Sequence, residues 1–564
     1  MRKPLRRLAT IVIALFAVYL IAGNVFLNTG FGPWAINRKP ERFMLGWSHG
    51  VTWWPGFVVM WNVEARGHVR HVLWDAQTAS ASGRIALLPL FARELRVSAI
   101  DVEELTGAIA RSEQEMLPPP ARAGGWTLRF DRIATDSLHR ARVLGIDIET
   151  TGMAEFGFIK QLRGGPMEIL PSHVVLTDSR FTLGELVLLR EARIESTFAI
   201  DRHLREDAPG VAKLGLTDAT LRIEGALPEL SLDLDSTGHW HGAVVSAATA
   251  GRLDANLAVS KGVLQPGGAI ALHVPLKATR GTTSSEEIAT LRVDVQDQGV
   301  HVMAHLPPPP EGTGSIDADL FVAGTGLLPI ADTRALLARV SGSFDLDWRF
   351  AALDWLTPLL VKTPWIALQG AGTVKANLKI EQGQLTIGSR VDVPEVDLVA
   401  TAAGYRFQGR AVAQGRLVEA KGGASAQIKL VLARFDAVAD DARDKPLLRG
   451  TDLRIDLQSA GDVHDFRESL RAQLRFEKAE VPDLRVINRY LPGDSMSLLG
   501  GNVRIGGDLA LDAGGRIERG RIDLQGRSAK TQFGAINLRG DFDLDARIGG
   551  TDIAARHFDL DNTT

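Results

Sequence analysis

The chain has 564 residues, of which 45% are hydrophobic and 23% charged, and its formal net charge is −3. This composition excludes a disordered chain and a polytopic membrane protein, and the lack of a basic excess argues against nucleic-acid binding. Because the sequence contains no cysteine, disulfides, thiolate nucleophiles and cysteine-based zinc or iron–sulfur sites are excluded. A chain of this length predicts several domains or one long repetitive body.

The first expected element is a membrane anchor at residues 8–27, after a short cytoplasmic tail at residues 1–7. Asn24 is the only strongly polar residue of this segment, and about 20 apolar residues are enough to cross ~30 Å of hydrocarbon. The residues expected to form the anchor include Ile11, Leu15, Phe16 and Leu20. The preceding basic residues predict a cytoplasmic N-terminus and an exported remainder; they are Arg2, Lys3, Arg6 and Arg7.

A cleaved signal peptide is the alternative to the anchor. Its apolar region should be shorter and should end at a site with small residues. Ala22-Gly23-Asn24, followed by Val25, Phe26 and Leu27, makes a poor site of this kind. The sequence has no second run of similar length, so we expect a single-pass protein.

The segment after the anchor is rich in tryptophan. Residues 40–47 predict a short amphipathic helix that begins at Pro40. Two interpretations of the tryptophans stay open: a collar at the membrane–water interface, which Trp favours, or a packed cap on the end of a sheet. The residues concerned are Trp34, Trp47, Trp53, Trp54 and Trp61.

Short segments of alternating apolar and polar residues recur from residue 85 onward, and such alternation is typical of β-strands. Examples start at Ile85 and Trp126, a less clean one starts at Arg96, and others lie at residues 230–235 and 270–276. The prolines and glycines of residues 307–314 interrupt the pattern, which indicates a domain boundary or a long surface loop.

Only a few segments later in the chain predict helices. Apolar residues at spacings of three and four occur in Leu327–Val340, in Ala351–Val361 and in Asp483–Leu491, which ends at Pro492-Gly493. The sequence stops at Thr564 with no recognisable closing element, so we expect the natural chain to run on.

The strands share one feature: each has an apolar face and an ionic face. In Ile536–Ile548 the apolar residues all fall on even positions, with charged and polar residues between them. Three arrangements would cover such faces: two stacked sheets, a closed barrel, or an open trough whose lining contacts something other than protein. The residues expected to line the apolar face are Leu232, Leu272, Phe344, Leu346, Trp348, Ile428, Leu430, Leu432, Leu453, Ile455, Leu457, Ile536, Leu538, Phe542 and Leu544.

The open trough is favoured because few linkers divide the chain, whereas sandwiches usually form units of about 100 residues. We therefore expect a mainly β protein: a transmembrane helix followed by a long, twisted, open groove of many antiparallel strands with a few short amphipathic helices. Its N-terminal part would be residues 28–306 and its C-terminal part residues 315–564, joined by the loop at 307–314. Exposed apolar surface of that extent marks a binding site, and acyl chains are the obvious occupant.

Three stretches carry a resemblance to a known family. They are the basic-flanked anchor, the segment from VTWWPG at residue 51 to RIALLPLFARELRVSAIDVEEL, and DLRVINRYLPGDSMSLLGGNVRIGGDLAL at residues 483–511. In pattern and layout the chain resembles the AsmA-like proteins, which are related to TamB and to the bridge-like lipid transfer proteins. The resemblance implies a protein anchored in the inner membrane of a Gram-negative cell, with its bulk in the periplasm, that passes phospholipids in outer-membrane biogenesis. An outer-membrane or other envelope protein is a further expected partner.

Catalytic and metal chemistry find little support. His239 and His241 could form half of a metal site, but surface histidines are the favoured interpretation, and the same holds for His68 and His71. The acidic segment at residues 436–444 lacks the spacing of a calcium loop, and a nucleophile motif G-x-S-x-G is absent from the sequence. We expect no cofactor and no enzymatic activity. The alternatives to lipid transport are a non-transporting scaffold or assembly factor built of β-sandwiches and, third, a periplasmic enzyme.

Overall fold

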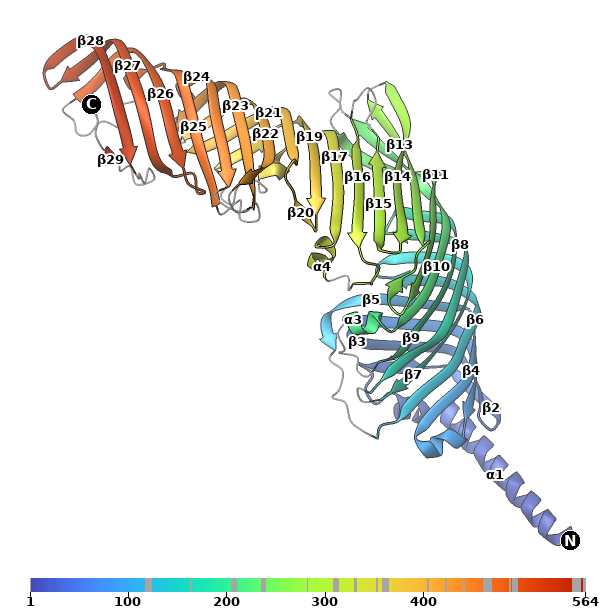
Figure 1. The fold of residues 1–564 in the computed structure, drawn as a ribbon. Helices are drawn as coiled ribbons and strands as arrows, with labels where there is room; N and C mark the ends of the chain where they lie inside the picture. Colours follow the sequence, from blue (N-terminus) through green and yellow to red (C-terminus); the bar gives the residue numbers. More distant parts are fainter. Residues whose placement is uncertain are drawn as a thin grey trace.

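A single long sheet makes up most of the molecule, and Figure 1 shows it running from the N-terminal helix at one end to β28 at the other. The computed structural model describes residues 2–116, 124–162, 165–203, 210–234, 240–280, 282–307, 314–328, 332–350, 353–357, 365–402, 405–420, 423–439, 442–459, 469–485, 488, 496–549 and 559–560. The sheet has 29 strands and is mostly antiparallel, with parallel pairs at β4–β6, β5–β6 and β10–β13. A mainly β protein with one apolar N-terminal helix and few short helices is therefore confirmed.

The elements of the first part are α1 (Arg2–Asn28), α2 (Phe31–Ile36), β1 (Phe43–Gly46), β2 (His49–Trp54), β3 (Phe57–Ala86), η1 (Leu88–Ala92), β4 (Glu94–Glu103), β5 (Leu105–Met116), β6 (Thr127–Val143), β7 (Ile146–Gln161), β8 (Met167–Leu183), β9 (Leu186–His203), α3 (Gly210–Leu214), β10 (Thr217–Leu234), β11 (Trp240–Ser260), β12 (Val263–Leu264), β13 (Ala269–Arg280), β14 (Thr283–Gln296) and β15 (Gly299–Leu306).

The elements of the second part are β16 (Ile316–Ala323), α4 (Thr333–Leu337), β17 (Val340–Phe350), η2 (Asp354–Leu356), β18 (Ile366–Gln369), β19 (Gly372–Glu381), β20 (Gln384–Leu385), β21 (Arg390–Ala402), β22 (Tyr405–Ala420), β23 (Gly423–Ala439), β24 (Ala442–Ser459), β25 (Leu470–Val481), β26 (Met496–Leu511), β27 (Ile517–Phe533), β28 (Ile536–Gly549) and β29 (Asp559–Leu560). The Pro- and Gly-rich residues 307–314 lie between β15 and β16, which pair with each other from Leu306 and Ile316 onward.

The long strands bend where an extra residue interrupts the pairing. Asp178 in β8, Glu191 in β9 and Ser528 in β27 have left-handed backbone conformations, with φ of 49°, 48° and 49°. The register shifts at these places, for example between Leu176 and Ser179. Such bulges bend a strand and increase its twist, which accounts for the curvature of the sheet.

The helix predicted at residues 40–47 is wrong. Phe43–Gly46 is strand β1, whose residues pair with Glu64–Gly67 of β3. Segment FMLG is too short to support a helix by itself, and the free edge of β3 offers it backbone hydrogen bonds.

The other predicted helices are shorter in the structure or fall partly outside its described residues. Among the described residues of Leu327–Val340, only Thr333–Leu337 is helical, and Val340 already belongs to β17. The segment Ala351–Val361 contains the 3-10 turn η2, and the rest of it lies largely outside the described residues. Of Asp483–Leu491, the structure describes residues 483–485 and 488, with 3-10 conformation at 484, 485 and 488.

Candidate functional site

Apart from Leu232, the residues predicted to line the apolar face share one side of the sheet. Register pairs connect them from strand to strand: Leu346 pairs with Ala376, Ala376 with Val391, Val391 with Gly415, Gly415 with Ile428, and Ile428 with Leu457. A second row joins Leu272 through Leu291, Ala304 and Ala318 to Phe344. Since alternate residues of a strand share a face, these rows define one continuous apolar face.

Between β6 and β17 this face is mostly half-buried, although Leu276 and Val295 on it are only 4% and 5% exposed. Leu272, Phe344, Leu346 and Trp348 are neither fully exposed nor enclosed. At the start of this stretch the rings of Phe130 and Phe158 stack with centroids 4.7 Å apart. The side chain of Leu232 lies outside the described part of the chain. This portion, which we call the half-buried face, leaves apolar side chains within reach of a ligand.

From β18 to β27 the same face is a packed core. Four of the predicted residues are 0% exposed, namely Leu430, Leu432, Leu453 and Ile455, and Leu457 is 1% exposed. Ile428 is partly buried and packs against this core. Leu353, Trp365 and Leu484 come from connecting segments and belong to the same core. The sequence pattern did not single out Trp365, because it lies in a short non-strand segment where no periodicity marks the inner side, whereas Leu353 lies within the predicted helix Ala351–Val361.

One contact joins distant parts of this packed core. The indole Nε1 of Trp365, just before β18, donates a hydrogen bond of 3.1 Å to the carbonyl oxygen of Ala513 in the β26–β27 turn. The ring covers Gly515, where a Cβ would lie 2.8 Å from the indole Cγ. Strands β21 to β25 lie in the sheet between β18 and the β26–β27 turn. The contact therefore joins the two sides of the curved sheet across its apolar face.

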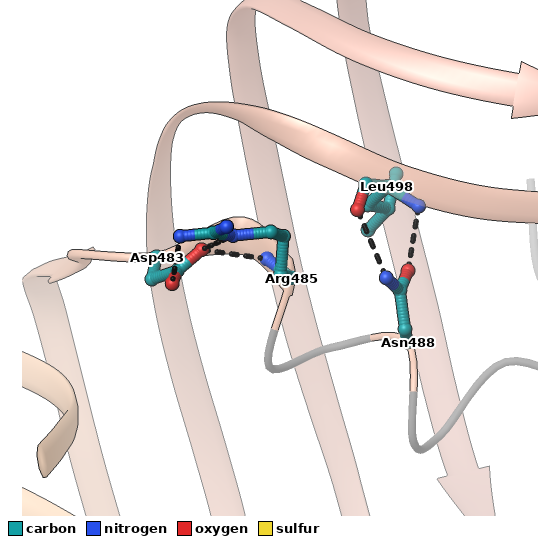
Figure 2. Close-up of polar contacts among 4 residues, drawn as sticks. All are labelled: Asp483, Arg485, Asn488 and Leu498. Carbon is teal, nitrogen blue, oxygen red and sulfur yellow. Dashed lines mark hydrogen bonds and ion pairs between the residues drawn. The ribbon is translucent and has the colours of Figure 1, made fainter.

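The connection between β25 and β26 adds a second closing segment (Figure 2). The Asp483 carboxylate accepts hydrogen bonds from the backbone nitrogen of Arg485 at 3.1 Å and from its Nε at 2.9 Å. Leu484, which lies between them in the chain, is fully buried. The Asn488 amide pairs with the backbone of Leu498 in β26, donating to its oxygen at 2.9 Å and accepting from its nitrogen at 2.5 Å. These bonds hold Leu484 against the core.

The far end of the apolar face is more open. Ile536 is 62% and Leu538 52% exposed, whereas Phe542 and Leu544 are half-buried. Leu544 pairs with Leu524, and Phe542 with Gly526, so the start of β28 extends the apolar face beyond the packed core.

The opposite face of the sheet is ionic. Arg521 pairs with Asp545 at 2.6 Å, and Arg449 with Asp436 at 3.3 Å, across neighbouring strands. Strands β22 to β28 line an open hollow of about 1560 Å³ on this side. Near the other end of the sheet, burial raises the pKa of Asp131, but hydrogen bonds from Arg129 and Arg96 outweigh it and hold that pKa below its usual value. Such a surface suits contact with water.

The N-terminal helix is long and apolar enough to span a membrane, over Thr10–Asn28. Ile11 and Leu15 are exposed, whereas Phe16 and Leu20 are half-buried because strand β2 lies against this end of the helix. The side chains of Arg2, Lys3, Arg6 and Arg7 lie outside the described part.

The tryptophans after the anchor divide into exposed side chains and side chains with contacts inside the protein. Trp34, Trp53 and Trp54 are exposed. Trp47 donates a hydrogen bond of 2.7 Å to the carbonyl oxygen of Leu27, and Trp61 stacks on His49.

The histidines do not assemble a metal site in the described residues. His68 Nε2 lies 3.1 Å from the carbonyl oxygen of Gln114, and His71 Nδ1 lies 3.3 Å from that of Ser112. No group of three or more His, Cys, Asp or Glu residues in the described ranges is placed to hold a metal ion. His239 and the side chain of His241 lie outside those ranges.

A scan against protein-family models finds no match to the chain, and a search of curated proteins finds no significant match either. Function therefore has to follow from the residues and their geometry.

Proposed function

We propose that this protein is anchored in the inner membrane by α1 and binds lipid acyl chains along its half-buried face, in support of phospholipid transport to the outer membrane. The observation that supports this proposal is the continuity of the apolar face through register pairs over strands β6 to β17, with side chains that are mostly half-buried. Each CH₂ group of an acyl chain buried there contributes roughly 0.8 kcal/mol.

The anchor supports the same proposal. An apolar helix of suitable length leads directly into the sheet, and the basic residues before it favour a cytoplasmic N-terminus with the sheet in the periplasm. The resemblance to AsmA-like proteins is in line with this arrangement. The proposal includes no catalytic step.

The packed core favours a scaffold role for the C-terminal part. Leu430, Leu432 and Ile455 contact protein and have no exposed surface for a lipid. We therefore assign lipid binding to the half-buried face and a structural role to β18–β27. In a protein that acted only as a scaffold, no part of the sheet would contact lipid.

Photocrosslinking along the sheet tests the proposal. A photoreactive residue at Leu272 or Phe344 of the full chain in native membranes is expected to crosslink phospholipid, detected by mass spectrometry. The matched control is Asp345, which is exposed on the ionic face next to Phe344. A probe at Leu430 is expected to give no lipid adduct, because this side chain is 0% exposed. Lipid-free protein with no adduct at Leu272 or Phe344 would overturn lipid binding.

A further inference from the structure

The apolar helix α1 is hydrogen-bonded to strand β2 through two asparagine side chains. The Asn24 amide donates to the carbonyl oxygen of Thr52 at 2.9 Å and accepts from its backbone nitrogen at 3.1 Å. One helical turn later, Asn28 makes the same pair of bonds with Gly50, at 2.7 Å and 3.3 Å. Helix and strand are thus fixed side by side, and Gly23 allows this approach because a Cβ there would lie 2.7 Å from Thr52.

These bonds satisfy the backbone of β2 on the side that faces α1. The other side of β2 pairs with β3. In the turn that follows, the backbone nitrogen of Gly56 donates to the Tyr19 hydroxyl at 2.8 Å. A strand can lie in hydrocarbon only when its backbone groups are paired within the protein, and β2 meets this requirement at Gly50 and Thr52. Three polar residues of α1, namely Tyr19, Asn24 and Asn28, have hydrogen-bond partners here.

The end of this hairpin carries exposed aromatic residues. Trp54 is 65% exposed, and its ring packs edge-on against Phe16, with centroids 6.1 Å apart. The 3-10 turn η1 lies beside the hairpin, because the nitrogen of Ile85 bonds to the oxygen of Gly56 at 2.6 Å. Within η1, Phe91 is 91% exposed. We call Trp53–Phe57 and Leu88–Ala92 the apolar tips.

The position of Phe16 in the helix sets the depth of the tips. At 1.5 Å per residue, Phe16 lies roughly 18 Å from Asn28, which is close to the midplane of a hydrocarbon layer ~30 Å thick. The basic residues Arg2–Arg7 keep the other end of α1 at the opposite surface. Trp54, which contacts Phe16, is then below the surface at which Asn28 lies.

We propose that the apolar tips are embedded in the membrane leaflet farther from Arg2–Arg7, so that the apolar face of the sheet begins inside the hydrocarbon. This inference rests on the membrane anchoring in the proposed function. Strand β6 starts next to η1, where the nitrogen of Thr127 bonds to the oxygen of Arg93 at 3.0 Å. Phe130 of the half-buried face follows three residues after Thr127 and pairs with Phe158 of β7, so an acyl chain can pass from the leaflet onto the sheet without crossing water.

The charged residues beside the tips are compatible with this depth. Arg84 and Arg93 are exposed, and arginine side chains extend from hydrocarbon to the headgroup layer. Just after α2, the guanidinium of Arg38 lies over the ring of Trp34, 4.3 Å from the ring centroid. Such a cation–π pair is suited to the membrane–water interface.

Depth-dependent quenching tests the inference. The cysteine-free chain allows single labels through Trp54→Cys and Phe91→Cys, with the full chain in phosphatidylcholine vesicles. A bimane label at either position is expected to be quenched several-fold more by lipids with a nitroxide on the acyl chain than by aqueous iodide. The control is Leu144→Cys, a 67% exposed leucine after the far end of β6, a strand of 17 residues or about 56 Å. Its label is expected to show the reverse order.

Stronger quenching by iodide than by nitroxide lipid at both tips would overturn the inference. Phe91 makes the result independent of the Trp54 contact, because its exposed side chain has no packing role. Crosslinking at Phe344 on the same preparation separates the two proposals. Lipid adducts at Phe344 together with tips that are exposed to water would support lipid binding and would contradict only the proposal that the tips are embedded in the membrane.

Discussion

Single asparagine side chains form hydrogen bonds with the backbone of strands at places where no neighbouring strand pairs with them. Asn37 pairs with the backbone of Leu45 in β1 at 2.9 Å and 2.8 Å, in the way that Asn24, Asn28 and Asn488 pair with other strands. An amide side chain has both a donor and an acceptor, so it can match the two backbone groups of one strand residue. Edges closed in this way are less open to pairing with another chain.

Asp512 plays a related part in the turn that Trp365 covers. Its carboxylate accepts hydrogen bonds of 2.9 Å from the backbone nitrogens of Gly514 and Arg516 and from Arg516 Nε. Burial raises the pKa of Asp512, but the bonds from Arg516 and Gly514 outweigh it and the pKa lies below its usual value. A carboxylate with a lowered folded pKa stabilises the fold above its unfolded value of about 3.9, and this stabilisation is lost as pH falls through the folded pKa.

Asp512→Asn is expected to lower the free energy of unfolding at neutral pH by about 1–2 kcal/mol, because it removes charge-assisted hydrogen bonds. It should also weaken the loss of stability that the native chain shows on acidification below about pH 4. Urea unfolding at several pH values measures both effects. Asp543→Asn, at an exposed carboxylate on β28, is the control and should leave the free energy of unfolding at neutral pH nearly unchanged. Identical profiles for Asp512→Asn and the native chain would contradict the assignment.

Neighbouring strands of the packed core fit together through phenylalanine–glycine pairs. Phe435 lies opposite Gly450, Phe476 opposite Gly507, and Phe542 opposite Gly526. The rings of Phe435 and Phe476 also contact each other, with centroids 5.8 Å apart. A glycine leaves room for the ring of the next strand, so this row of pairs joins β23 to β28 across the sheet.

Gly507→Ala tests this packing, because the added Cβ would lie 2.6 Å from Cε1 of Phe476. Displacing the ring is expected to cost about 1–3 kcal/mol, which exceeds the roughly 0.4–1 kcal/mol that alanine contributes by restricting the unfolded chain. Gly540→Ala in β28 is the control, since a Cβ there has no atom within 4 Å. Urea unfolding should show a loss for Gly507→Ala only; equal stability of the two variants would refute the packing role.

At the scale of the whole molecule, the apolar face changes from half-buried to packed along one continuous sheet. The difference comes from the connecting segments, since Leu353, Trp365 and Leu484 lie over the C-terminal strands. Over β6 to β17 the described residues include no comparable cover. The two parts can therefore differ in function although their strands follow the same pattern.

Trp365→Ala is expected to open the packed core, at a cost of about 3–5 kcal/mol, because it removes a buried ring. Hydrogen exchange followed by mass spectrometry should show faster exchange in β21–β27 and unchanged exchange in β6–β14. Trp126→Ala, at a tryptophan that is 44% exposed, is the control and should leave β21–β27 unchanged. A uniform increase along the chain after Trp365→Ala would show that the two parts unfold together.

Much of the fold could be predicted from the sequence because strand alternation is a local property. Ile536–Ile548 was expected to be a one-sided strand, and β28 covers it with Leu544 and Phe542 on the apolar side. The same reasoning placed Phe344 and Ile428 on a common face. Residues 40–47 were missed because a four-residue strand depends on its partner β3 more than on its own pattern.

By itself, the sequence determined that most of the chain forms strands, that many of these strands have one apolar side, and that a helix able to span a membrane precedes them. Only the tertiary structure decided where the apolar face is packed and where it is half-buried. That decision depends on contacts between residues far apart in the chain, such as Trp365 and Ala513, which are separated by 148 positions. A period of two residues reports the direction of a side chain, but it holds no information about what lies opposite.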